Sequence, residues 1–150
     1  IRADATGDDA FLDSACFDTQ QAIEFILKFI LSEYGISYKK THDIRYLAEL
    51  LDTTTFKFDK SAELNNMADT ITNWETGSCY GSGVRTTVET IHSAHDIYKS
   101  VDDAFMQMQE SLNAIKAIAV IDDQFTAIID YADAGKIDNI YLPASSLSTK

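Results

Sequence analysis

The sequence predicts an all-α protein, an antiparallel bundle of four to five helices with a long C-terminal helix or helical extension. Three observations predict this fold class. Apolar residues recur at steps of three and four through most of the 150 residues. The whole chain contains one proline and six glycines, and the thirty residues after Val84 contain neither. With 45% hydrophobic residues, the chain can bury the core of one ordinary domain.

The first long helix is expected from about Ala10 to Tyr34. Phe25 and Phe29 widen an apolar face that the 3.6-residue period defines. The other residues of this face are Ala22, Ile23, Ile26, Leu27, Ile30 and Leu31. Gln20, Gln21, Glu24 and Lys28 make up much of the more polar side. Gly35 follows the last periodic residue and suits a left-handed C-cap.

Two shorter helices are expected next. The first runs from Thr41 to Asp52, and either Thr41 or Asp43 can cap its free amides. The second runs from Asp59 to Trp74, with Asp59 or Ser61 as its cap.

Loops are expected on both sides of the second short helix. Phe56 and Phe58 lie in the loop before it, and we expect their two rings to plug the core. Glu75 to Gly83 contains three glycines within seven residues and is predicted to be a loop.

A heptad pattern begins at Val84 and predicts one long helix. Its members are Val84, Ile91, Ala94, Tyr98, Val101, Phe105, Met108, Leu112 and Ile115. Apolar spacing continues from Ile118 to Ala132, and Gly135 offers a C-cap. The pattern leaves open whether residues 84–134 form one helix or two.

Two segments carry a resemblance to a known family. The first contains Ala15, Phe17, Gln20-Gln21-Ala22, Glu24, Lys28, Tyr34-Gly35 and Thr41-His42-Asp43-Ile44, with Leu47 and Leu50. The second contains Trp74, Ser78 and Tyr80, with Cys79 at a position where many relatives have arginine. Together they resemble a HEPN domain, the higher eukaryotes and prokaryotes nucleotide-binding helical domain.

The resemblance implies a division of the chain. Residues 1–108 would form the HEPN-like domain with its first helix truncated, because only residues 1–5 could be a last turn of that helix and Thr6 to Asp9 are expected to form a loop. Residues 109–142 would be a helical extension packed on the same core. Residues 143–150 would be a flexible tail.

Arg85 and His92 are the candidate catalytic residues. Many HEPN ribonucleases carry an arginine and a histidine separated by four to six residues, and six residues separate these two. Seven positions are almost two helical turns, so both side chains share one face about 10 Å apart. Arginine can hold a phosphate oxygen, and histidine can transfer protons near neutral pH. The resemblance implies that two copies of this motif meet across a homodimer.

A nucleotide ligand would contact Tyr80, Lys99 and His95, which are the candidate binding residues. Lys99 follows His92 by seven positions and therefore lies on the same helix face. His95, which lies beside the heptad positions, is a second candidate. His42 is expected to serve local capping or packing. No metal site is predicted, although His92, His95 and Asp96 have a spacing that could in principle hold zinc.

Charge and cysteine usage limit the partners and the compartment. The formal net charge is −12 at pH 7, which disfavours nucleic acid, so no DNA binding is expected and RNA binding would need a local basic patch or a basic partner. Cys16 and Cys79 are expected to be reduced, which points to the cytoplasm. No stretch predicts a membrane span or a signal peptide.

Three functions stay open from the sequence. The first is a dimeric, nucleotide-associated HEPN module without strong catalysis, such as the helical partner of a minimal nucleotidyltransferase. The second is a metal-independent ribonuclease, the toxin of a toxin–antitoxin pair, acting through Arg85 and His92. The third is a purely structural dimerisation module. No cofactor is expected beyond a possible nucleotide ligand.

Overall fold

The fold is described from a computed structural model. It describes the backbone of residues 2–76 and 86–133 and the side chains of residues 10–76 and 86–124. The chain divides into two units, Ile1–Gln107 and Met108–Lys150, which we call the core unit and the extension unit. The expected packing of the extension on the core stays a prediction.

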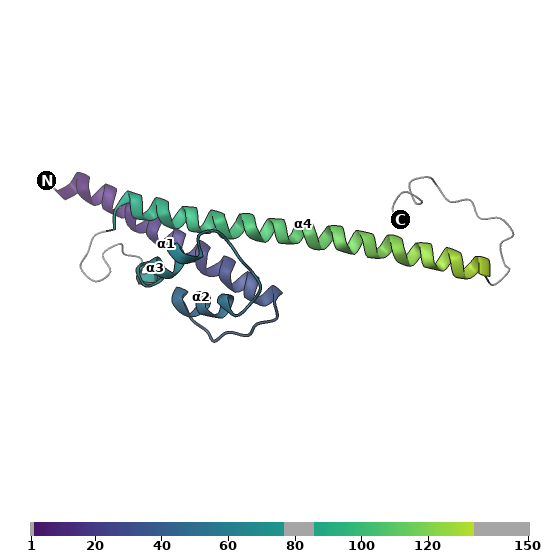
Figure 1. The fold of residues 1–150 in the computed structure, drawn as a ribbon. Coiled ribbons are helices and arrows are strands. Elements are labelled where there is room, and N and C mark those ends of the chain that lie inside the picture. The colour runs from purple at the N-terminus through teal and green to yellow at the C-terminus, as the bar shows by residue number, and fades with distance from the viewer. Residues whose placement is uncertain (1, 77–85, 134–150) are drawn as a thin grey trace. The chain divides into compact units, whose positions relative to one another are not determined.

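Four α-helices and one short 3-10 helix form the described part. They are α1 (Arg2–Glu33), α2 (Ile44–Asp52), α3 (Ser61–Asn73), η1 (Trp74–Thr76) and α4 (Val88–Asp133). The predicted all-α bundle with a long C-terminal helix is confirmed. In the core unit, α2, α3 and η1 pack on α1, and α4 lies beside α1 (Figure 1).

The core forms from the apolar faces that the helical period predicts. Trp74 from η1 is 1% exposed, and its indole Nε1 donates to Thr86 Oγ1 at 3.1 Å just before α4. Phe56 plugs the core as expected, while Phe58 is half-buried beside it. The other large apolar side chains that are fully buried are Ile23, Leu27, Ile30, Leu31, Ile44, Leu47, Leu51, Leu64, Ile71 and Ile97.

The end of α1 and the start of α2 are capped as the sequence predicts. Gly35 has a φ of 68°, and the Ile36 amide donates to Leu31 O at 2.9 Å, which closes the helix C-terminus. Asp43 is the N-cap of α2, and its carboxylate accepts from the Tyr46 amide at 3.2 Å. Thr41 Oγ1 accepts from the Asp43 amide.

Other helix boundaries differ from the expectation. Residues 6–9 are helical rather than a loop, because α1 runs without a break from Arg2. A single glycine in a helix costs about 1 kcal/mol relative to alanine, which a long helix tolerates. The α3 N-cap is Lys60, which makes no capping bond with its side chain, so the expected caps Asp59 and Ser61 are wrong.

The heptad pattern forms one continuous helix at least as far as Asp133, which settles the question of one helix or two for residues 88–133. The first half of the heptad pattern is covered by its own chain and needs no second copy, because Ile91, Ala94 and Val101 are buried within the core unit.

Cys16 is completely buried and disulfide-bonded, so the expected reduced thiol is wrong. The chain's second cysteine, Cys79, lies outside the described residues. Because the cytoplasmic location was inferred from reduced cysteines, that inference loses its support.

Candidate functional site

The candidate site lies where α1 and α4 run side by side in the same direction. Thr19 Oγ1 lies 2.8 Å from His95 Nε2, and the Phe29 and Phe105 rings meet edge to face at 5.3 Å between centroids. Both pairs are separated by 76 residues in sequence, so the two helices keep one register over three turns.

Two matched stripes of side chains mark the outer side of this helix pair. Each stripe uses steps of four, three, four, three and four residues, which places its members within an arc of about 80° on the helix. We call the two stripes together the α1–α4 face. It consists of Phe11, Ala15, Asp18, Ala22, Phe25 and Phe29 on α1, and Val88, His92, His95, Lys99, Asp102 and Met106 on α4.

Two cavities open along this face and share Ala15 and His95. The first has a volume of about 540 Å³ and is mainly apolar, with His92 and His95 as its polar residues. Its apolar lining comes from Phe11, Leu12, Ala15, Val88 and Ile91. The second, about 720 Å³, is more polar and reaches Lys99 and Asp102. His95 therefore stands between an apolar cavity and a charged one.

Carboxylates dominate the charged cavity. Asp18, Asp96 and Asp102 line it together with Lys99. Three carboxylates against one ammonium group leave a formal charge of −2 when the histidines are neutral. Such a site repels a polyanion unless a second molecule supplies cations.

The structure places three of the five predicted site residues on this face. His92, His95 and Lys99 share the α4 stripe, and all three side chains are exposed. Arg85 and Tyr80 lie outside the described residues, so the pairing of Arg85 with His92 stays a prediction.

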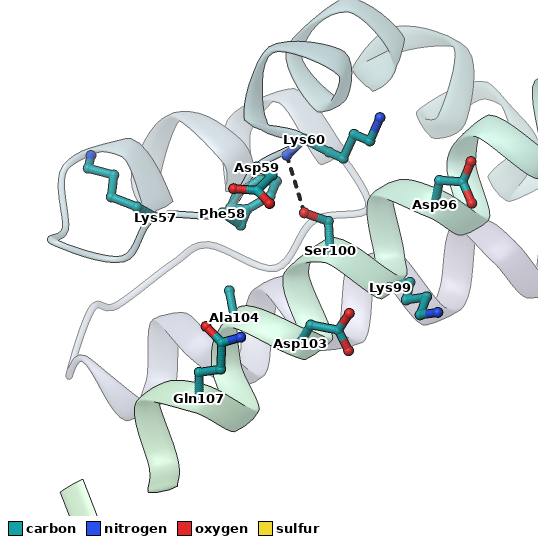
Figure 2. A pocket seen from close by; sticks show the side chains of 10 residues that line it. All are labelled: Lys57, Phe58, Asp59, Lys60, Asp96, Lys99, Ser100, Asp103, Ala104 and Gln107. Atoms are coloured by element: carbon teal, nitrogen blue, oxygen red, sulfur yellow. Dashed lines mark hydrogen bonds between the residues drawn. The ribbon is translucent and has the colours of Figure 1, made fainter. Parts of the chain in front are cut away.

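A third cavity, of about 390 Å³, lies between the α2–α3 loop and α4 (Figure 2). The Lys60 amide donates to Ser100 Oγ at 3.2 Å and holds the loop against the helix. Lys57 and Lys60 extend in opposite directions in Figure 2, so their ammonium groups do not converge on a common anion. Asp59, Asp96 and Asp103 also line the cavity.

A buried polar network centred on Glu24 is not predicted by the sequence pattern. Gln20 and Glu24 are expected on the polar side of the helix, but they are 0% and 2% exposed. The Glu24 carboxylate accepts from Gln20 Nε2 at 2.7 Å, from Lys28 Nζ at 2.6 Å and from His42 Nδ1 at 3.0 Å. His42 Nε2 lies 3.8 Å from Glu75 on η1.

These bonds explain why glutamine, glutamate, lysine and histidine occur together in the pattern that resembles HEPN domains. Burial alone would raise the pKa of Glu24, but hydrogen bonds from Lys28, Gln20 and His42 outweigh burial and lower it below the ordinary value of 4.5. Glu24 therefore stays ionised and ties α1 to the loop before α2. Its role is structural, because its hydrogen-bonding capacity is taken up by neighbours.

Among the residues that the structure describes, no three histidine, cysteine, aspartate or glutamate side chains are grouped so that they could hold a metal ion. No helix in the described part is long and apolar enough to cross a membrane.

Fold and site together define an all-α module with an uncovered two-helix face that carries two histidines and a lysine. The family model described as HEPN domain matches residues 2–118, which is most of the chain. The chain therefore belongs to the HEPN domain family, a class of helical, nucleotide-associated modules that commonly dimerise. No curated protein and no solved structure matches it.

Proposed function

We propose that this chain is a nucleotide-associated HEPN module that dimerises through the α1–α4 face and assists a minimal nucleotidyltransferase without strong catalysis of its own. The supporting observation is the exposure of large apolar side chains on that face. Phe11 is 79% exposed, Phe25 61% and Phe29 52%. Exposed apolar groups gathered on one face are typical of a surface that a partner covers.

A second copy of the chain is suited to pack against the α1–α4 face. Apolar residues lie at both ends of the two stripes, and the charged residues lie between them. A two-fold axis through the middle would bring apolar ends together and place Lys99 near the partner's aspartates. The two histidine pairs would then meet at the interface, in keeping with a site shared by two subunits.

The cavities favour a single nucleotide over a nucleic acid polymer. The apolar cavity beside His92 offers a place for a base, and Lys99 offers one cation for a phosphate. The three aspartates around Lys99 oppose a long chain of phosphates. This charge balance supports a module that binds a nucleotide weakly over one that cleaves RNA.

Sedimentation equilibrium tests the dimer. Phe25→Glu places a charge on the α1–α4 face and should raise the dimer dissociation constant at least tenfold, because a buried charge costs well over 1.4 kcal/mol. Phe17→Glu is the matched control, since Phe17 is 39% exposed on another side of α1. A monomeric wild-type protein would refute the proposal.

Calorimetric titration with ATP, alongside the other nucleoside triphosphates, tests ligand binding. Wild-type protein should release heat with at least one of them, and Lys99→Ala should weaken that binding about tenfold. Lys57→Ala removes a lysine outside the α1–α4 face and should have no effect. If no nucleoside triphosphate gives heat, the nucleotide role is lost and the structural dimerisation module is the better hypothesis.

One observation favours the ribonuclease alternative. The exposed His92 side chain borders the apolar cavity, and no described residue forms a hydrogen bond with its ring. If the chain is an endoribonuclease toxin, purified protein should cleave labelled RNA in the presence of a chelator. His92→Ala and Arg85→Ala should each abolish cleavage, whereas His95→Ala should retain it. Intact RNA with the wild-type protein would rule this alternative out.

A further inference from the structure

Thr19 and His95 make a polar contact in the middle of the α1–α4 face. Thr19 Oγ1 lies 2.6 Å from Ala15 O, a distance at which two oxygens repel each other unless a hydrogen lies between them. The hydroxyl therefore donates its one hydrogen to Ala15 O, because a carbonyl oxygen can only accept. It follows that Thr19 Oγ1 accepts from His95 Nε2, which lies 2.8 Å away.

This contact decides which ring nitrogen of His95 carries the hydrogen. A neutral imidazole has one N–H group and one unprotonated nitrogen, so a donating Nε2 leaves Nδ1 as an acceptor. Within residues 10–76 and 86–124, no residue forms a hydrogen bond with Nδ1, and the His95 side chain is exposed. The buried hydroxyl of Thr19 thus holds the ring from one side and leaves Nδ1 open to a ligand that carries a hydrogen-bond donor.

His95 lies between the two places that a nucleotide would occupy under the proposed function. His92, beside the apolar cavity, precedes it by about 4.5 Å along the helix axis, and Lys99 follows it by about 6 Å. The ribose of a nucleotide lies between its base and its phosphates. A base in the apolar cavity and a phosphate at Lys99 therefore place the ribose at His95, which lines both cavities.

We propose that His95 Nδ1 accepts a hydrogen bond from a ribose hydroxyl, so that the site selects ribonucleotides over nucleotides that lack these hydroxyls. Thr19 is then a positioning residue, because it keeps the hydrogen on Nε2 and the ring in place. This inference rests on the proposed function and deepens it by naming the part of the nucleotide that the site distinguishes. Loss of one hydrogen bond should weaken binding about five- to tenfold.

Calorimetric titration of the full chain with ATP, GTP, CTP and UTP, and with the 2′,3′-dideoxy form of each, tests this selection. Wild-type protein should bind at least one ribonucleotide about five- to tenfold more tightly than its dideoxy form. His95→Ala should remove the preference and Thr19→Val should reduce it, whereas Thr19→Ser, which keeps the hydroxyl, should retain it. Equal wild-type affinities would overturn the inference and leave the proposed function standing, while no heat from any triphosphate would overturn both.

Nitrogen-15 NMR spectroscopy of the ligand-free protein tests the hydrogen bond without any nucleotide. At about pH 8, where an ordinary histidine side chain is neutral, the His95 hydrogen should be on Nε2 in the wild type and in Thr19→Ser. In Thr19→Val this hydrogen should exchange with water faster, because it has lost its acceptor. A hydrogen on Nδ1, or equal exchange rates in wild type and Thr19→Val, would overturn the inference whichever nucleotide binds.

Discussion

Glu24 joins three segments of the chain through one buried carboxylate. Its oxygens accept hydrogen bonds from Gln20 and Lys28 on α1 and from His42 before α2, and His42 reaches Glu75 on η1. Burying a charge is costly, and it stabilises a fold only when partners satisfy the charged group. Removing one side chain of this network should therefore lower the free energy of unfolding by more than the surface position of His42 suggests.

Glu24→Gln should lower the free energy of unfolding by about 1–3 kcal/mol at neutral pH, because Lys28 and His42 lose a charged acceptor. The pKa of Glu24 in the folded state is below its ordinary value of 4.5. The ionised carboxylate therefore stabilises the fold fully above pH 4.5, and this contribution is lost as pH falls through the folded-state pKa. Urea denaturation at several pH values measures both effects.

The matched control is Glu63→Gln, because the Glu63 side chain is 50% exposed and its ion pair with Lys60 is 3.9 Å long. It should change stability by less than about 0.5 kcal/mol. The difference between wild type and Glu24→Gln should shrink as the pH is lowered from 5 to 3. A constant difference over this range would contradict the assigned role of the charge.

The burial and hydrogen bonding of individual polar residues were the features least predictable from the sequence. The polarity of Gln20 and Glu24 assigns them to solvent when one helix is considered alone. Their burial comes from tertiary packing, and one partner of Glu24, His42, lies eighteen residues further along the chain and comes close only through the turn at Gly35. Periodicity within a helix cannot report such a contact, although the family resemblance contained every residue of the network except Glu75.

The ends of the helices were more predictable than these contacts, because the residues that begin and end a helix act locally in the sequence. Gly35 ends α1 and Asp43 begins α2, as expected from left-handed glycine and a side-chain cap. The N-terminus of α1 was misjudged, since a turn signal at Gly7 did not break the helix. A stretch of acidic residues near a helix N-terminus is favourable to the helix dipole, which helps explain the continuation.

Gly35→Ala should destabilise the protein by about 1–2 kcal/mol, since the left-handed conformation penalises any β-carbon. Among the described residues, no heavy atom beyond Gly35 and its two chain neighbours lies within 4 Å of an added β-carbon, so the cost comes from the backbone alone. Gly35→Asn should cost less, because asparagine tolerates this conformation better. Thermal unfolding of the two variants measures the difference. Equal losses would show that the backbone conformation is not the cause.

The α4 half of the candidate site was also predictable. His92 and Lys99 are seven residues apart, and the helical period alone places them on one stripe. The α1 half was not predictable, because Phe11, Asp18 and Thr19 reach the histidines only through tertiary packing. The sequence shows which residues share a helix face, but it does not show which helix lies opposite.

For the whole molecule, charge is the property that limits association. The chain carries −12, and the charged cavity on the α1–α4 face carries −2 in each copy. Two copies that meet through this face repel each other at low ionic strength, even though their apolar residues attract. Screening by salt weakens such repulsion over a Debye length of about 8–10 Å.

The dimer should therefore tighten as sodium chloride is raised from about 50 to 300 mM, with a several-fold fall in dissociation constant. Asp102→Asn removes one carboxylate from each copy and should reduce this salt dependence. Analytical ultracentrifugation of both proteins across the salt range measures it. A dimer that loosens with salt would mean that attractive ion pairs dominate the interface.

The common offset of 76 residues between α1 and α4 fixes which side chains meet along the two helices. Deleting one residue from α4, for instance Ser100, would turn the following part of the core unit's α4 by about 100° and carry Phe105 away from Phe29. Deleting one residue of α1 between Thr19 and Phe29 as well would restore the axial register, but both helices would turn in the same sense and the two rings would point to opposite sides of the helix pair. A matched deletion in the second helix therefore does not repair the contact, and neither helix can change its length between these two contacts without losing one of them.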